Sequence, residues 1–168
     1  MKLGEIANEG AAGYGKPLEG VRVLAAEQMQ ALPYATQLLA RLGAEVVKVE
    51  HPTTGESGRG SSPFMVDPEG RRVGATYLRN NFNKRSVGLD LKAPEGRDLF
   101  LDLVPHFDVV AENFKAGTME RLGLGYDVIA ERNPRAIHVS LSGFGVDSPY
   151  RDWSAYASIV EAMSGIYQ

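Results

Sequence analysis

Four polar segments of this sequence carry the side chains best suited to chemistry. They are residues 27–30 (EQMQ), His51, residues 112–114 (ENF) and residues 142–145 (SGFG). Side-chain amides can orient a carbonyl or carboxylate, glycines let a ligand approach the backbone, and an aromatic ring such as Phe114 can stack on a flat ring. Each segment follows an apolar run typical of a strand, and in an open parallel sheet ligands bind beyond the carboxyl ends of the strands. We therefore expect the four segments to form one binding site.

Lys84, Arg85 and Arg121 could supply positive charge for phosphate groups, and arginine can pair with phosphate in a planar fork. Each of these groups also has a structural interpretation. Lys84 and Arg85 could be solvated charges on a turn, and Arg121 could complement the end of a short helix. Asn113 could hold a turn by local backbone bonding. His51 has no metal partner nearby in the sequence, so no metal site is expected.

Residues 21–50 form the unit that must position these groups. The segment opens on the apolar residues Val21, Val23 and Leu24. Pro33 suits the first turn of a helix, and Gly43 suits the left-handed position that ends one. Residues 44–50 return to a valine-rich strand, so the pattern predicts one βαβ crossover of about 30 residues. Such a crossover makes its two strands parallel, and a parallel sheet needs cover on both faces.

Three further strands are predicted over residues 87–91, 108–111 and 136–141, with a helix starting at Pro94 between the first two. The predicted fold class is α/β: a Rossmann-like, open, mostly parallel sheet with helices on both faces.

Several local features are predicted around this sheet. Residues 1–17 should form a flexible N-terminal arm, and the glycine- and proline-rich residues 51–81 an exposed connection. Thr118 and Asp127 are predicted N-caps of two short helices. A last helix should begin near Ser154.

Composition excludes several classes of function. The 168 residues carry a net charge of −3, which offers no basic field for nucleic acid. There are no cysteines, so thiolate metal ligands and a cysteine nucleophile are excluded. No apolar run approaches the roughly 20 residues of a membrane span, and no secretory signal pattern is present. We expect a cytoplasmic α/β domain with no nucleic-acid or membrane partner.

The sequence resembles the class III coenzyme A transferase family (CaiB/BaiF), which includes formyl-CoA transferase and alpha-methylacyl-CoA racemase. The resemblance is carried by LGAEVVKVE, then NKRS with LDLK, then ENFKAGTMERLGLGYD, then SGFG, in that order. It runs from about Pro17 to the last residue. It implies a Rossmann-like CoA-binding domain, here residues 18–168 as its N-terminal part, incomplete relative to the family and without the family's second, smaller domain.

The resemblance also implies roles for individual residues. An acyl-CoA thioester and a carboxylic acid would be the substrates, and coenzyme A would lie at the strand ends. Asn113, Phe114 and Arg121 match CoA-contacting positions, as do Lys84 and Arg85 of the NKRS turn. Gln30 matches a position beside the reacting acyl group.

Two other positions depart from the pattern of formyl-CoA transferase. His51 stands where that enzyme has an arginine near the nucleotide. Ser154 stands where it has a CoA-contacting lysine.

Transferases of this family use an aspartate nucleophile that forms covalent intermediates. By motif order, that aspartate is expected beyond residue 168. We therefore expect this chain to be inactive alone, and to act as a homodimer or with a second chain that carries the C-terminal half. One alternative is racemisation, for which the family uses a histidine and an acidic residue where this chain has Tyr156 and Ala157. Another is a non-catalytic CoA-binding fragment.

Overall fold

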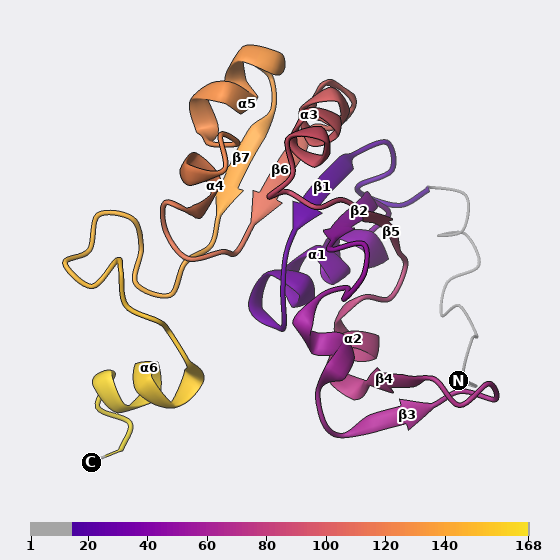
Figure 1. Ribbon diagram of the computed structural model, residues 1–168, viewed down its shortest axis with the longest axis vertical. Coiled ribbons are helices and arrows are strands. Elements are labelled where there is room, and N and C mark those ends of the chain that lie inside the picture. The colour runs from indigo at the N-terminus through magenta and orange to yellow at the C-terminus, as the bar shows by residue number, and fades with distance from the viewer. Residues whose placement is uncertain (1–14, 168) are drawn as a thin grey trace.

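The core of the molecule is a parallel sheet of five strands. The computed structural model describes residues 15–167, so the predicted arm over 1–17 lies almost wholly outside the described residues. The strand order is β5-β2-β1-β6-β7, and every neighbouring pair is parallel (Figure 1). The strands are β1 (Arg22–Ala26), β2 (Glu45–Glu50), β5 (Lys84–Gly88), β6 (Val109–Glu112) and β7 (Ile137–Ser140). The predicted Rossmann-like α/β class is confirmed.

The predicted crossover is present as β1, helix α1 (Ala31–Arg41) and β2. Pro33 lies in the first turn of α1, where its missing N–H leaves no hydrogen bond unmade. Gly43 follows the helix with φ of 110°, a left-handed conformation that a side chain would strain. These two residues set where the helix begins and ends.

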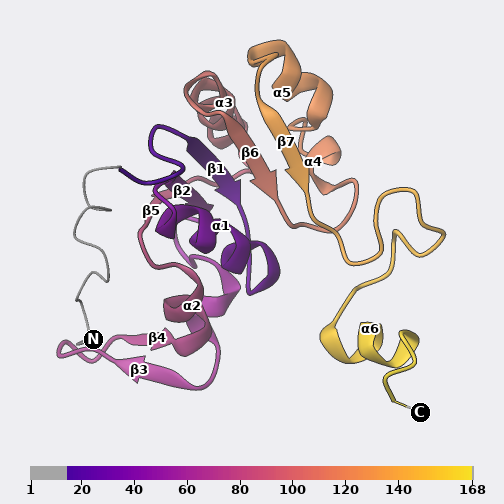
Figure 2. The ribbon, with the colours of Figure 1, turned by 180° about the vertical axis from the view of Figure 1, so that it is seen from behind.

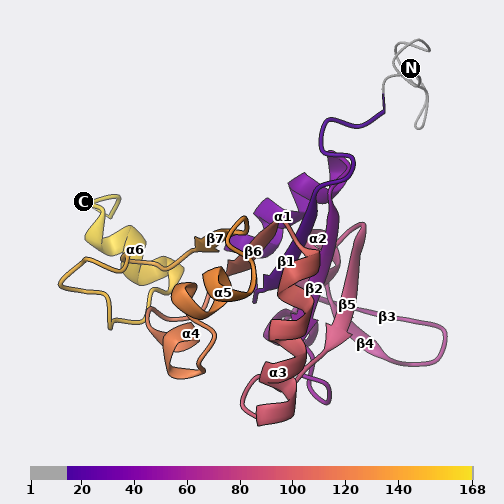
Figure 3. The same cartoon turned by 90° about the horizontal axis from the view of Figure 1, so that it is seen from above.

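Helices cover both faces of the sheet because side chains alternate along each strand. In β1, Val23 and Ala25 point to the core under α1, whereas Leu24 and Ala26 point to the opposite core. That second core contains residues of α3 (Pro94–Leu103), the 3-10 turn η3 (Val104–His106), α4 (Thr118–Arg121) and α5 (Tyr126–Arg132). Figure 3 shows α1 and α3 on opposite sides of the strands.

The connection over residues 51–81 is more ordered than predicted. It contains a 3-10 turn η2 (Ser57–Gly60), an antiparallel hairpin of β3 (Phe64–Val66) and β4 (Arg72–Gly74), and helix α2 (Ala75–Asn80). The hairpin is largely exposed, but Glu56 and Asn80 are buried against the end of β1. Polar composition concealed this packing because the buried side chains are themselves polar.

Two predicted elements have the wrong bounds. The strand predicted over residues 87–91 begins at Lys84, because Lys84–Gly88 pairs with β2, while Leu89 and Leu91 leave the sheet and pack on the core. The last helix, α6, is Ala157–Met163 and so begins after Ser154.

Both predicted N-caps are also wrong. Thr118 and Asp127 lie inside α4 and α5, whose N-cap residues are Gly117 and Gly125. Gly117 has φ of 76°, which glycine adopts without strain, so the chain enters α4 on a glycine and not on a side-chain cap.

Helix α6 stands apart from the sheet at the end of a long segment that follows β7 (Figures 1 and 2). No residue of α6 is buried. Ile137 and Val139 of the edge strand β7 are exposed as well. Among residues 15–167, no helix is both long and apolar enough to cross a membrane.

Candidate functional site

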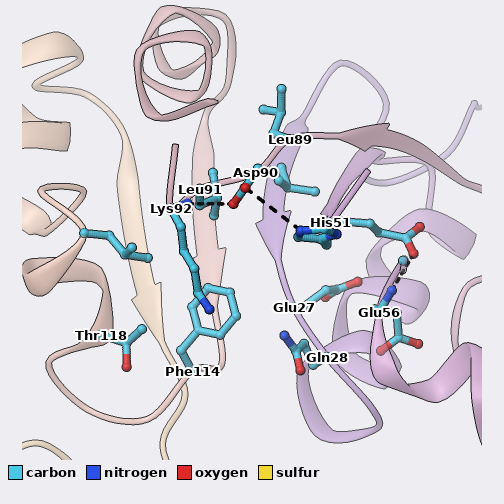
Figure 4. A pocket seen from close by; sticks show the side chains of 14 residues that line it. Glu27, Gln28, His51, Glu56, Leu89, Asp90, Leu91, Lys92, Phe114 and Thr118 are labelled. Atoms are coloured by element: carbon cyan, nitrogen blue, oxygen red, sulfur yellow. Dashed lines mark hydrogen bonds and ion pairs between the residues drawn. The ribbon is translucent and has the colours of Figure 1, made fainter. Parts of the chain in front are cut away.

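A cavity of about 300 Å³ opens at the carboxyl edge of the sheet, between the ends of β1, β2, β5 and β6. Its apolar side is formed by Val49, Leu89, Leu91, Phe114 and Leu122. Its polar residues include Gln28, His51, Asp90, Lys92 and Thr118. Figure 4 shows the Phe114 ring at the cavity with the Lys92 side chain extending toward it. An apolar slot bounded by an aromatic ring and an ammonium group suits a flat, negatively charged ligand.

A second cavity of about 340 Å³ lies beside the first, toward β7. Gln28 and Phe114 line both cavities, so the two are neighbours. The second cavity is also lined by Asn113, by Ser142 and Gly143 after β7, and by polar side chains of the later segment, Arg151 and Ser154. Three of the four segments singled out in the sequence therefore meet here, and the pair of cavities can hold an elongated ligand.

The turn after β1 is held by side chains from three distant segments. Asn113 accepts a hydrogen bond from the Gln28 N–H at 2.7 Å and donates one to the Gln28 carbonyl at 2.9 Å. The Met29 N–H donates to Glu56 at 2.7 Å, and Asn80 donates to the Met29 carbonyl at 3.3 Å. Met29 has φ of 62°, which is uncommon for a residue with a side chain. These contacts hold the strained turn that leads to Gln30.

A buried charge cluster lies directly beneath this turn. The Lys84 ammonium is 2.6 Å from a Glu27 carboxylate oxygen, and Lys48 is 3.9 Å from Glu27 and 3.8 Å from Glu56. These four side chains are almost completely buried. Burial lowers the pKa of Lys84 to about 8 and outweighs the opposing effect of Glu27. Burial likewise lowers the pKa of Lys48 below its usual value.

Glu50, the last residue of β2, organises the segment that follows it. Its carboxylate accepts two hydrogen bonds from Arg59, at 2.6 and 2.8 Å, and one from Ser86 at 2.6 Å. It also accepts the Glu56 N–H at 3.0 Å, which places Glu56 for its contact with Met29. Burial would raise the pKa of Glu50, but the bonds from Arg59, Ser86 and the Glu56 N–H outweigh it and lower the pKa to about 2.

This pKa predicts a stability change in acid. The Glu50 pKa falls from 4.5 to about 2 on folding. The charged carboxylate therefore stabilises the fold above pH 4.5, and this stabilisation is lost as the pH falls through 2. We expect Glu50 to account for a loss of about 2–3 kcal/mol in the free energy of unfolding over that range. Urea unfolding at several pH values measures it. Glu50→Gln should lack this part of the pH dependence, and parallel profiles for the two proteins would contradict the assignment.

Some of the predicted site residues lie at the first cavity, and others lie away from it. His51 and Phe114 line the first cavity, and Arg121 donates to the Thr118 hydroxyl at its rim, at 2.8 Å. Gln30 is the exposed residue that precedes α1.

The side chains of Lys84, Arg85 and Asn113 are engaged within the protein. Lys84 is buried against Glu27, and Arg85 pairs with Glu45 at 2.7 Å. Neither Lys84 nor Arg85 lines either of the two cavities. Asn113 lines the second cavity with its amide bonded to the turn after β1.

His51 carries a defined arrangement at the cavity. Its Nδ1 accepts the backbone N–H groups of Thr53 and Thr54, at 3.3 and 3.4 Å. Its Nε2 lies 4.0 Å from the Asp90 carboxylate. The imidazole thus closes the turn after β2 with one nitrogen and faces the cavity-lining acid with the other.

Sequence reasoning missed Glu56, Lys92 and Arg151, and it included Glu27 without identifying its partner. Lys92 stands in the LDLK motif, so that motif was the signal that could have found it. Glu27 stood within a segment already singled out, but its partner Lys84 is 57 positions away. Glu56 lay in a segment assigned to solvent. No sequence motif indicated a role for Arg151.

Comparisons with known proteins agree with the geometry. The model of CoA-transferase family III matches residues 18–168. The chain is 43% identical over 150 residues to the succinyl-CoA–L-malate CoA-transferase beta subunit of Chloroflexus aurantiacus, covering 89% of this chain and 36% of that relative. It is 43% identical over 151 residues to formyl-CoA:oxalate CoA-transferase of Streptomyces avermitilis, covering 89% and 35%.

A comparison with solved structures also finds a protein of this kind. The crystal structure of a CAIB/BAIF family protein from Brucella suis superposes with a TM-score of 0.84 at 38% identity, covering 90% of this chain and 40% of that chain. The chain spans about a third of the length of the two curated relatives.

Proposed function

This chain belongs to CoA-transferase family III, and on that premise we propose that it supplies the CoA-binding part of an enzyme that transfers CoA between carboxylic acids. The observation that carries the proposal is the pair of adjoining cavities at the carboxyl edge of the sheet. They share Gln28 and Phe114. Acyl-CoA is an elongated ligand with a flat, anionic nucleotide at one end and a thioester at the other, and it suits this arrangement.

We propose that the adenine ring occupies the first cavity, against Phe114 and near His51. Lys92 and Arg121 would then face the phosphates. The pantetheine chain would pass Gln28 toward the second cavity, and Gln30 would orient the thioester carbonyl. Lys84 and Asn113 would act through the turn after β1, because both side chains are already bonded to that region.

The proposed chemistry is covalent. A carboxylate attacks the thioester carbonyl carbon and CoA leaves as the thiolate, which gives a mixed anhydride. The thiolate then attacks the enzyme's carbonyl of that anhydride, releasing the first acid and leaving an enzyme–CoA thioester. An acceptor acid reverses the two steps. The nucleophilic aspartate is expected beyond residue 168, in the same chain or in a second one.

The assembly and the cellular location are also proposed from membership of the family. We propose a homodimer, or a complex with a second chain that carries the remaining part of the enzyme, in the cytoplasm. Racemisation has no support in the described residues at the matching position, because Tyr156 is exposed and Ala157 has no ionisable group.

Arg121→Ala tests the nucleotide site. A charge-assisted contact to phosphate is worth on the order of 1.5–3 kcal/mol, so the variant should bind CoA roughly ten-fold more weakly. Its stability should change little because Arg121 is exposed. Isothermal titration calorimetry with CoA gives the affinity.

The matched control for Arg121→Ala is Arg132→Ala. Arg132 is also exposed, but it pairs with Asp102 at 3.6 Å and ends α5 at the opposite edge of the sheet. The Arg132→Ala variant should bind CoA with the affinity of the wild type. An Arg121→Ala variant with unchanged affinity would move the phosphate site elsewhere.

A further inference from the structure

Two arginines face the same point above the turn that follows β6. A Cβ atom built on Gly117 would lie 3.1 Å from Arg121 Nη1 and 3.5 Å from Arg151 Nη2. Arg121 belongs to α4, whereas Arg151 comes from the segment after β7. Two guanidinium groups from separate segments of the chain therefore converge on one position of the backbone.

Neither guanidinium is neutralised within residues 15–167. The one side-chain hydrogen bond of Arg121 there goes to the uncharged Thr118 hydroxyl at 2.8 Å, and no carboxylate of that region lies within ion-pair distance of either arginine. Other arginines of the chain do pair with acids, among them Arg22, Arg59, Arg71, Arg85 and Arg132. Like charges brought together without a counter-ion repel, and an anion between them removes the repulsion.

The position of the pair indicates which anion it binds. Thr118, the partner of Arg121, lines the first cavity, and Arg151 lines the second together with Lys115. The pair therefore bridges the two cavities. In CoA, the group between the nucleoside and the pantetheine chain is a diphosphate, which carries charge on two adjacent phosphates. Guanidinium forks match phosphate oxygens in geometry and charge.

We infer that Arg151 forms, with Arg121, an arginine clamp for the diphosphate of CoA. This inference rests on the proposed function and adds a binding residue to it. Gly117 has a part in the clamp. Its φ of 76° would strain a residue with a side chain, so glycine suits the point where the two arginines meet.

The test is calorimetry on this chain with CoA, ADP, adenosine and inorganic diphosphate as probes. Arg151→Ala should weaken CoA and ADP binding roughly ten-fold and leave adenosine binding unchanged, because adenosine lacks the diphosphate. Arg151→Lys keeps the charge without the fork and should recover part of the affinity. Arg151→Glu should lower it further, because a glutamate there can pair with Arg121.

Stability separates a binding role from a structural one. Removing one of two repelling charges should leave the melting temperature of the ligand-free chain unchanged or raised in Arg151→Ala, whereas loss of a structural contact would lower it. Arg132→Ala serves as the control for a neutral surface change.

Each outcome decides between the two proposals. If CoA binds the wild type and Arg151→Ala equally well, the clamp is wrong while the CoA site stands. If CoA does not bind but inorganic diphosphate does, and does so through Arg151, the clamp stands and the CoA proposal fails. If neither probe binds, both are overturned.

Discussion

Lys84→Met is expected to lower the free energy of unfolding by about 3–5 kcal/mol at pH 7, the range for breaking one partner of a buried ion pair. The Lys84 ammonium lies 2.6 Å from Glu27, and both side chains are almost fully buried. Methionine keeps most of the length of the side chain but leaves Lys48, at 3.9 Å, as the nearest cation to Glu27 among the described residues. Urea unfolding followed by circular dichroism measures the change.

Two comparisons identify the cause of that loss. The double variant Lys84→Met with Glu27→Gln should recover much of the stability, because no uncompensated charge stays buried. Arg85→Ala removes the neighbouring residue of the same motif, whose pair with Glu45 is solvent-exposed, and should change stability by less than about 1 kcal/mol. Equal losses in Lys84→Met and Arg85→Ala would refute the assignment of Lys84 to a buried pair.

Gly96→Ala should also be strongly destabilising, by about 3 kcal/mol, although alanine is normally the better helix former. Gly96 lies in the first turn of α3, and an added Cβ would collide with the carbonyl group of Asp90. The obstructing atoms are backbone, so residues 90–92 must move. Asp90, Leu91 and Lys92 line the first cavity, so the same change should lower CoA affinity. Thermal unfolding and calorimetry measure the two effects.

Gly60→Ala is the matched control for Gly96→Ala. A Cβ at Gly60 meets no atom within 4 Å, and its φ lies outside the left-handed region. This variant should keep both stability and CoA affinity. A Gly96→Ala protein as stable as Gly60→Ala would show that the segment after β5 is not packed against α3 as described.

The sequence by itself determined the architecture of this protein. The apolar runs and the breaks at Pro33 and Gly43 predicted the βαβ unit over residues 21–50, and the structure confirms it. The reason is that strand and helix periodicities, and the backbone preferences of proline and glycine, are local properties. Since parallel strands end at one edge, local reasoning also indicated which segments would meet in the two cavities.

Only the tertiary structure decided what the individual side chains do there. The predicted contact of Lys84 and Asn113 with CoA stays a prediction, and the structure adds that their polar groups bond to Glu27 and Gln28, 57 and 85 positions away. The Glu56 contact with Met29 and the meeting of Arg121 with Arg151 likewise join segments that no local pattern connects. The physical reason is that a charged or amide group takes the nearest suitable partner in space. That partner is set by how distant elements pack and not by residue type or spacing along the chain.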